Sequence, residues 1–233
     1  MLLKNRLDFA QLYREEKRRI GRPAKTPQQW DKRAHKLRDQ PLASPYATEL
    51  ISHIDFTGAR TLLDVGCGAG NIAIQVAQRL DAVYGLDYSP VMLDVLMHHA
   101  RTAGLANVHP VNASWDDDWD DVPVCDLVVA SRSTLVEDMG DALQRLHRHA
   151  RQRVYITYPA SGFFAPSRDA GAAQGQGSGA PDYMFILNIL RQQGVFPTLQ
   201  YIQTPHHSAP SQGNSPDAGS VRWALIAWDV APA

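Results

Sequence analysis

Residues 61–71 read T-L-L-D-V-G-C-G-A-G-N, and this stretch decides the fold. An apolar run with the length of a β-strand leads into three glycines at alternate positions, Gly66, Gly68 and Gly70. An amphipathic run over residues 71–80 follows and predicts a helix. Strand, glycine turn and helix together open a nucleotide-binding α/β unit, in which bare backbone and free helix N–H groups receive the ligand.

A second short apolar strand, Ala82 to Asp87, ends in an acid. An acid at that place can reach the two ribose hydroxyls of a bound nucleoside. Ser89 and Pro90 then predict the start of a helix, as N-cap and first-turn residues. A dinucleotide fingerprint requires G-x-G-x-x-G, and its last glycine is replaced here by Asn71. The pattern that remains is acid-x-G-x-G-x-G, beginning at Asp64.

D-V-G-C-G-A-G at Asp64–Gly70 and G-L-D-Y-S-P-V-M-L at Gly85–Leu93 resemble the first two motifs of the class I S-adenosylmethionine-dependent methyltransferases. The resemblance covers Trp30 to Pro159 well and the rest of the chain more loosely. It implies a Rossmann-like α/β fold with a seven-stranded, mainly parallel sheet, an antiparallel last strand and helices on both faces. The alternation of short apolar strands with helical stripes favours the same architecture.

The resemblance implies S-adenosylmethionine as cofactor and S-adenosylhomocysteine as its product. Asp64 would orient the methionine amino group, and Asp87 would accept hydrogen bonds from the ribose hydroxyls. Tyr88 and Trp115 would flank the adenine, and Cys67 would be a spacer in the motif, without a catalytic role. The expected cofactor-binding residues are Asp64, Gly66, Cys67, Gly68, Gly70, Asn71, Asp87, Tyr88, Met92, Asn112, Ser114, Trp115 and Ser131.

One position departs from the family pattern. The loop after the third strand reads the adenine edge in similar enzymes, usually with an acid near the position of Asn112. No acid stands there in this sequence, so Asn112 or Ser114 would have to serve.

The fourth predicted strand, residues 124–130, is almost continuously apolar, as a buried parallel strand should be, and it ends at Ser131-Arg132-Ser133. Loops beyond strand C-termini form the site in open parallel sheets. Arg132 is therefore a candidate substrate residue, an anion clamp for the acceptor or for the methionine carboxylate; a surface ion pair is the alternative. The S-R-S loop is not the N-P-P-Y type that amino-methylating enzymes use on nucleobases and glutamine side chains. It favours a small-molecule acceptor.

The chain divides into an N-terminal helical extension that covers the site, residues 1–50, and an S-adenosylmethionine-binding methyltransferase domain, residues 51–233. Thr26 to Gln29 reads as a capping box that starts a helix. Trp30 on this helix belongs to a W-D-x-R-A-like segment that covers the cofactor pocket in similar enzymes. It is the second substrate candidate, with simple packing as the alternative. The Gly-rich segment 161–181 is predicted to be an active-site lid or a disordered loop.

Charge and composition favour a protein without a nucleic-acid or membrane partner. The formal net charge of −1 gives no global argument for nucleic-acid or membrane binding. Lys17-Arg18-Arg19 forms a basic cluster, which predicts a solvated helix face. The alternative is a contact to an anionic substrate or RNA. Lys4 follows Leu2-Leu3 at once, so no signal peptide is expected, and the predicted location is cytoplasmic. The pair His206-His207 has no third ligand spaced near it, so no metal site is expected.

Three functions remain open at this point. The favoured function is an S-adenosylmethionine-dependent methyltransferase that acts on a small molecule by in-line displacement. The alternatives are a non-catalytic S-adenosylmethionine-binding protein and an NAD-dependent oxidoreductase, against which Asn71 argues. A methyl group on a sulfonium is already activated, so the protein needs no nucleophile of its own. The sequence leaves open the acceptor, its reacting atom, any general base and the oligomeric state.

Overall fold

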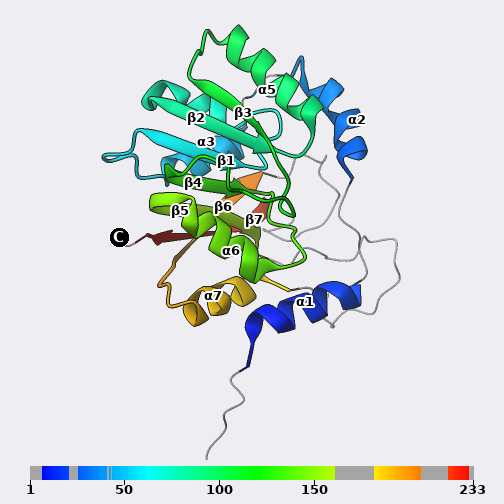
Figure 1. The fold of residues 1–233 in the computed structure, drawn as a ribbon, viewed down its shortest axis with the longest axis vertical. Helices are drawn as coiled ribbons and strands as arrows, with labels where there is room; N and C mark the ends of the chain where they lie inside the picture. The colour runs from blue at the N-terminus through cyan, green and yellow to red at the C-terminus, as the bar shows by residue number, and fades with distance from the viewer. Residues whose placement is uncertain are drawn as a thin grey trace, which may run out of the picture.

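The structure is a computed structural model that describes residues 7–20, 26–40, 42, 44–160, 181–205 and 220–230. Its strands form a seven-stranded sheet in the order β3-β2-β1-β4-β5-β7-β6 (Figure 1). The elements in chain order are α1 (Phe9–Ile20), α2 (Pro27–Leu37), α3 (Pro45–Ser52), β1 (Thr61–Val65), α4 (Ala73–Val76), a 3₁₀ turn (Ala77–Arg79), β2 (Ala82–Asp87), α5 (Pro90–Thr102), β3 (Val108–Asn112), β4 (Cys125–Ser131), α6 (Met139–Arg148), β5 (Ala150–Pro159), α7 (Tyr183–Gln192), β6 (Thr198–Pro205) and β7 (Ser220–Asp229).

The sheet has the predicted direction of strands. Strands β3, β2, β1, β4 and β5 pair in parallel, while β7 runs antiparallel to both of its neighbours, β5 and β6. The prediction of a mainly parallel sheet with an antiparallel last strand is confirmed. Because parallel strands share one direction, the carboxyl ends of β1, β2 and β4 meet at one edge, and the loops that carry the sequence motifs meet there too.

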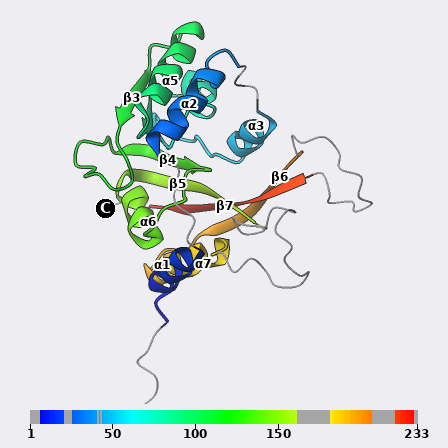
Figure 2. The same cartoon turned by 90° about the vertical axis from the view of Figure 1, so that its right-hand side faces the viewer.

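Alternate residues of the central strands face two hydrophobic cores. Leu63 and Val128 pack with α1, α6 and α7 on one face of the sheet. Their neighbours Leu62 and Val129 pack with α3, α4 and α5 on the other. Helix α2 lies against α5 on the outside of this second layer (Figure 2). Helices therefore cover both faces, as predicted.

Two local predictions need correction or explanation. The run 71–80 is not one helix: α4 spans only Ala73–Val76 and tightens into the 3₁₀ turn, a common way for a short helix to end. Pro110 does lie within β3, opposite Gly85 of β2. It is tolerated because β3 stands at the edge of the sheet, where one side of the strand has no ladder to make.

The N-terminal helices pack on the domain. The capping box of α2 is confirmed on its backbone side, since the Thr26 N–H donates to Gln29 Oε1 at 3.1 Å. The prediction of a solvated basic face on α1 is wrong for Lys17, which is only 7% exposed and donates from Nζ to the Val136 carbonyl at 3.2 Å. Burial lowers the pKa of this lysine, so α1 holds a desolvated amine against the loop after β4.

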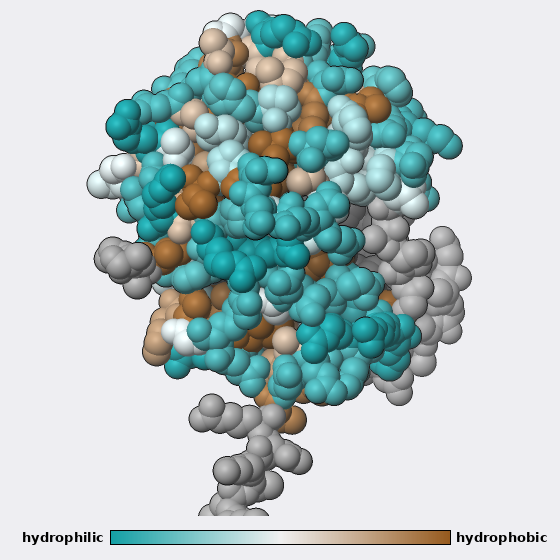
Figure 3. Space-filling model, viewed as in Figure 1, coloured by the Kyte–Doolittle hydropathy of each residue, from teal (hydrophilic) through white to brown (hydrophobic). Residues whose placement is uncertain are grey.

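Residues 161–180 of the Gly-rich segment and the pair His206-His207 lie outside the described residues. In the part of the chain that is described, no helix combines the length and the apolar character needed to cross a membrane. The face of the molecule in Figure 3 is mainly hydrophilic, because the large apolar side chains are taken up by the two cores.

Candidate functional site

The glycine turn after β1 packs tightly against its neighbours on one side and is open on another. The N–H groups of Gly66 and Cys67 donate to the Leu86 carbonyl at 2.7 and 3.0 Å. Gly66 has φ 71°, and a Cβ there would lie 2.3 Å from Ser133 Cβ, so only glycine fits. Gly68 has φ 53°, and a Cβ there would meet nothing within 4 Å. The backbone at Gly68 is therefore open to a ligand.

Asp87, at the end of β2, is bonded directly to this turn. Its carboxylate accepts from the Gly68 N–H and the Ser89 N–H, both at 2.9 Å, and the residue is 6% exposed. Burial raises the pKa of Asp87, and the backbone hydrogen bonds oppose that rise. Ser89 also caps α5 by accepting from the Met92 N–H, while its hydroxyl donates to Asp31 of α2 at 2.6 Å. One short segment thus joins the turn, α5 and α2.

Asp64 lies on β1 beside this turn and is 2% exposed. Its Oδ2 accepts from the Ala73 N–H at the start of α4, at 3.2 Å. Burial raises the pKa of Asp64 to about 7, the Ala73 N–H opposes the rise, and the negative charge of Asp87 adds to it. Within the described residues neither acid takes part in an ion pair. Two buried acids beside an open glycine turn suit a ligand that carries positive charge.

Two of the expected polar residues lie on the rim of the turn. Asn112 at the end of β3 is exposed, and its Nδ2 donates to the Asp87 carbonyl at 3.0 Å. Asn71 is also exposed, and its carbonyl accepts from Gln75 Nε2 at 2.7 Å. The Asn112 side chain is thus bonded to the backbone of Asp87, and its contact with adenine stays a prediction.

Trp115 follows β3 and contacts the loop after β4. Its indole N–H donates to the Ser133 carbonyl at 3.1 Å, and its ring stacks on Trp119 at 5.3 Å between centroids. Trp119 in turn donates to the Ser114 carbonyl at 2.7 Å. The stack uses one face of the Trp115 ring, so a contact with adenine, which stays a prediction, would have to use the other face or the edge.

Trp30 and Tyr88, which the sequence placed in separate roles, are hydrogen-bonded to each other through their side chains. Burial raises the pKa of Tyr88, and this bond opposes the rise. Trp30 also packs against a small cluster that includes Ala34 of α2 and Met92 of α5. The packing alternative for Trp30 is therefore observed, and the same contact brings α2 onto the segment that carries Asp87.

A histidine that the sequence reading missed strengthens this attachment. His99 of α5 is buried, and its ring nitrogens lie 2.9 Å from the Ala69 carbonyl and 2.9 Å from the Arg38 carbonyl. It therefore links the glycine turn to the C-terminal end of α2. The only sequence signal was its place within the helical stripe of α5, which does not distinguish a polar link from ordinary packing.

The end of β4 carries a network of hydroxyl groups. Tyr46 of α3 is 7% exposed, and its hydroxyl lies 2.9 Å from Ser131 Oγ and 2.6 Å from Thr157 Oγ1. Thr157 Oγ1 also accepts from the Arg132 N–H at 3.1 Å. Burial raises the pKa of Tyr46, so its hydroxyl stays protonated at neutral pH. Ser131 was expected in the cofactor site, whereas Tyr46 and Thr157 were not found from the sequence, because the contacts join segments distant in the chain.

Arg132 lies against two aromatic rings. Its guanidinium carbon is 5.2 Å from the centroid of Tyr46 and 5.4 Å from that of Trp223 on β7. The backbone of Arg132 is left-handed, with φ 59°. The side chain is exposed, and no carboxylate among the described residues pairs with it. The surface ion pair considered as an alternative is thus not formed within this part of the chain.

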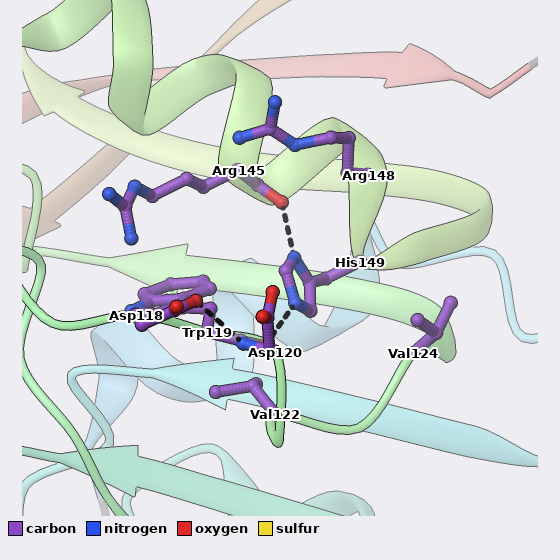
Figure 4. Close-up of a pocket in the computed structure, with 8 residues that line it drawn as sticks. All are labelled: Asp118, Trp119, Asp120, Val122, Val124, Arg145, Arg148 and His149. Carbon is purple, nitrogen blue, oxygen red and sulfur yellow. Dashed lines mark hydrogen bonds between the residues drawn. The ribbon is translucent and has the colours of Figure 1, made fainter.

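A separate hollow of about 520 Å³ lies at the opposite edge of the sheet, before β4 and β5 begin (Figure 4). Two of its polar side chains are already engaged: His149 faces the carbonyls of Arg145 and Trp119, and Arg145 pairs with Asp141 at 2.6 Å. None of the expected site residues lines it; the lining is Asp118, Trp119, Asp120, Val122, Val124, Arg145, Arg148 and His149. This hollow is not the site that the motifs define.

Comparisons with known proteins agree with the motifs. Residues 62–153 match a family described as a methyltransferase domain. The chain is 36% identical over 211 residues to an uncharacterized protein of Haemophilus influenzae, covering 90% of this chain and 78% of that protein. It is 30% identical over 145 residues to a trans-aconitate 2-methyltransferase of Rhodococcus jostii, covering 59% of this chain and 54% of that enzyme.

Among solved structures, a SAM-dependent methyltransferase from Aquifex aeolicus has a TM-score of 0.58 at 18% identity, covering 89% of this chain and 100% of that one. That likeness concerns the fold. The match of residues 62–153 to the methyltransferase domain, with the two motifs, assigns the chain to the class I S-adenosylmethionine-dependent methyltransferases, and the fold agrees with this assignment.

The residues present fit the cofactor of this family. S-adenosylmethionine carries an ammonium and a sulfonium group. These positive charges would stabilise the ionised forms of Asp64 and Asp87, whose pKa values are raised by burial. The open space at Gly68 lets a ligand approach the backbone, and the left-handed turn is available only because glycine stands there.

Proposed function

We propose that this protein transfers the methyl group of S-adenosylmethionine to a small-molecule acceptor. The observation that supports it best is the junction of Gly68, Asp87 and Ser89, which places a buried carboxylate beside open backbone at the shared edge of β1 and β2. The proposed cofactor residues are those that the motifs gave: Asp64, Gly66, Cys67, Gly68, Gly70, Asn71, Asp87, Tyr88, Met92, Asn112, Ser114, Trp115 and Ser131.

The cofactor supplies a methyl group that is already activated on a sulfonium. The chain's own task is to bind, to align and to exclude water. In this proposal Asp64 holds the methionine ammonium, Asp87 accepts from the ribose hydroxyls, and the glycine turn lies along the ligand. Asp87 has lone pairs left for this purpose, because a carboxylate accepts about four hydrogen bonds and two are used by backbone N–H groups.

The N-terminal segment forms part of the cover of this site in the proposal. Helix α2 is attached to the Asp87 segment through Asp31 and Trp30, and its C-terminal end is attached through His99. Helix α3 reaches the ends of β4 and β5 through Tyr46. Residues 1–50 would thus act as the helical extension that shields the acceptor from solvent, as the sequence predicted.

A small-molecule acceptor is supported by two observations. The S-R-S loop after β4 lacks the N-P-P-Y pattern of enzymes that methylate amino groups of nucleobases and glutamine. One relative is named as a methyltransferase of trans-aconitate, which is a small organic acid.

Two measurements test the proposal. Calorimetric titration with S-adenosylmethionine, S-adenosylhomocysteine and NAD should give saturable binding of the first two and none of the third. Incubation with methyl-labelled S-adenosylmethionine and a panel of small acids that includes trans-aconitate should then transfer label to at least one of them. Binding without transfer to any member of a broad metabolite panel would favour the non-catalytic binding protein instead.

A further inference from the structure

Arg132 belongs to the loop that contacts the end of β1, and its guanidinium lies against aromatic rings of α3 and β7. Arg132 directly follows β4, and the next residue, Ser133, donates to the Val65 carbonyl at 2.6 Å. The Arg132 side chain lies instead against Trp223, which pairs with Pro159 at the end of β5. The cation therefore lies over the β5–β7 side of this edge of the sheet, whereas the proposed cofactor site lies at the ends of β1 and β2.

The backbone of Arg132 is held in a conformation that a residue other than glycine rarely adopts. Its φ is 59°, and no other described non-glycine residue has a positive φ. Its N–H donates to Thr157 Oγ1, and the Tyr46 hydroxyl that contacts this oxygen is buried. Non-glycine residues in the left-handed region cost free energy and are concentrated at binding sites. The conformation of Arg132 is therefore consistent with a role in binding.

The charge of Arg132 is oriented without being neutralised. The faces of Tyr46 and Trp223 attract the cation and limit its freedom, but they leave the N–H groups at its edge available. Among the described residues no acceptor takes a hydrogen bond from this guanidinium, and no acid pairs with it. Six described arginines contact an aspartate or glutamate: Arg14, Arg19, Arg60, Arg145, Arg151 and Arg153. Four others, Arg33, Arg79, Arg191 and Arg222, lie over one ring each without such a contact, whereas Arg132 lies over two rings and has a left-handed backbone.

We propose that Arg132, on the platform formed by Tyr46 and Trp223, binds a carboxylate group of the methyl acceptor and so selects acidic small molecules. This inference rests on the proposed function. A guanidinium matches a carboxylate with two parallel N–H···O bonds, which fix orientation as well as charge. Anchoring an acid group over the end of β5 leaves the rest of a small acceptor to extend toward β1, where the proposed cofactor lies. Tyr46 acts here as a positioning residue, through Thr157 and the backbone of Arg132.

The test measures binding to the protein saturated with S-adenosylhomocysteine, so it does not depend on knowing the true acceptor. The probes are trans-aconitate, tricarballylate, succinate and inorganic phosphate, each titrated calorimetrically, with trimethyl tricarballylate as the uncharged comparison. The variants are Arg132→Gln and Arg132→Lys, with Arg222→Gln as the matched control. Arg222 is an exposed arginine on β7 beside an aromatic ring, 5.9 Å from Tyr201, and neighbours Trp223 in the chain on the opposite face of the strand.

The expected result is saturable binding of at least one of the three carboxylate probes, and none of the ester. Arg132→Gln should weaken it by roughly ten- to a hundredfold, Arg132→Lys less, and Arg222→Gln not measurably. The affinity for S-adenosylhomocysteine should stay within about twofold of the original protein in all three variants.

Several outcomes would overturn the inference. These are no carboxylate binding to the original protein, equal binding in Arg132→Gln, or binding of phosphate alone. A selective loss of S-adenosylhomocysteine affinity in Arg132→Gln would show that the arginine holds the methionine carboxylate instead of the acceptor. Failure of S-adenosylhomocysteine to bind the original protein would refute the proposed function itself, which keeps the two failures distinct.

Discussion

The Gly68 N–H donates to Asp87 Oδ2 across 2.9 Å, so the turn after β1 and the acid at the end of β2 form one structural unit. The pairing of Val65 with Leu86 sets this distance, because it brings the two strand ends level. Ser89 extends the unit to α5 and α2 through its N–H and its hydroxyl. A change at Asp87 should therefore affect both the ligand and the local fold.

Replacing Asp87 tests the proposed ribose contact. Asp87→Ala should weaken S-adenosylhomocysteine binding by about 1–3 kcal/mol, as expected for hydrogen bonds to a charged group. It should also lower the free energy of unfolding, because the N–H groups of Gly68 and Ser89 lose their acceptor. Calorimetry and urea denaturation measure the two effects. Asp121→Ala, at an exposed acid, is the control, and an unchanged dissociation constant in Asp87→Ala would remove Asp87 from the site.

Gly66 tests the close approach of two loops. Gly66→Ala combines a left-handed φ with a Cβ 2.3 Å from Ser133 Cβ, so β1 and the loop after β4 must separate. Gly58→Ala has a similar φ of 73° in open space and isolates the cost of backbone strain, about 1–2 kcal/mol. Urea denaturation should show a clearly larger loss for Gly66→Ala, and calorimetry a loss of S-adenosylhomocysteine affinity in that variant alone. Equal losses of stability would mean that Ser133 moves aside freely.

The sequence predicted the succession of strands and turns in the motif unit and the residues of those turns, because these features depend on local spacing. Glycines at alternate positions, an acid after a strand and a serine before a proline each have a local physical meaning. The attachments between distant segments were not predictable in this way. Tyr46 is one tyrosine in a short helix, and nothing in its neighbours indicates that its hydroxyl contacts Ser131 and Thr157.

Lys17 and the segment 71–80 are two places where a local sequence pattern led to a wrong prediction. A basic cluster predicts a solvated face, yet α6 and α7 pack against α1 and leave Lys17 facing the Val136 carbonyl. An amphipathic run predicts a helix, yet the glycine turn delays the start of α4 until Ala73. Tertiary packing overrode the local pattern at Lys17, and the neighbouring glycine turn shortened the helix at Ala73.

Asp64 makes stability depend on pH. Its pKa is about 7 in the folded protein and near the ordinary value of about 3.9 when unfolded. The folded state therefore holds a proton that the unfolded state has lost, and stability falls as pH rises from about 4 to 7, by up to about 4 kcal/mol. The raised pKa of Asp87 acts in the same direction.

Asp64→Asn should remove much of this dependence and should make the protein more stable than the original above pH 7, while weakening S-adenosylhomocysteine binding. Thermal melts from pH 4 to 8 measure it. Asp126→Asn is the control with the opposite sign. Burial acts to raise the pKa of Asp126, but hydrogen bonds from Arg60 and Thr61 lower it below its ordinary value. The stability that ionised Asp126 contributes is therefore lost as pH falls. Parallel pH curves for Asp64→Asn and the original protein would contradict the assignment.

Arg132→Gly separates the structural from the binding role of this arginine. The substitution relieves a left-handed residue, which favours the variant by about 1–2 kcal/mol, and removes contacts with two rings, which disfavours it by about 0.5–1 kcal/mol each at an exposed site. The two effects nearly cancel, so the free energy of unfolding should stay within about 1 kcal/mol of the original value. Arg132→Gln loses the ring contacts and keeps the strain, so it should be the less stable of the two variants.

Carboxylate binding should be weakened by roughly tenfold or more in both variants, whatever their order of stability. If Arg132 served mainly to fasten Tyr46 and α3 to β7, stability would fall in both variants, and the Tyr46 ring, which packs edge-on against Trp223 at 5.5 Å, would become mobile. Urea denaturation together with titration of trans-aconitate into the S-adenosylhomocysteine complex distinguishes these cases. A glycine variant that is destabilised by several kcal/mol and still binds the acid would assign Arg132 to the fold, because its side chain would then be needed for packing and dispensable for recognition.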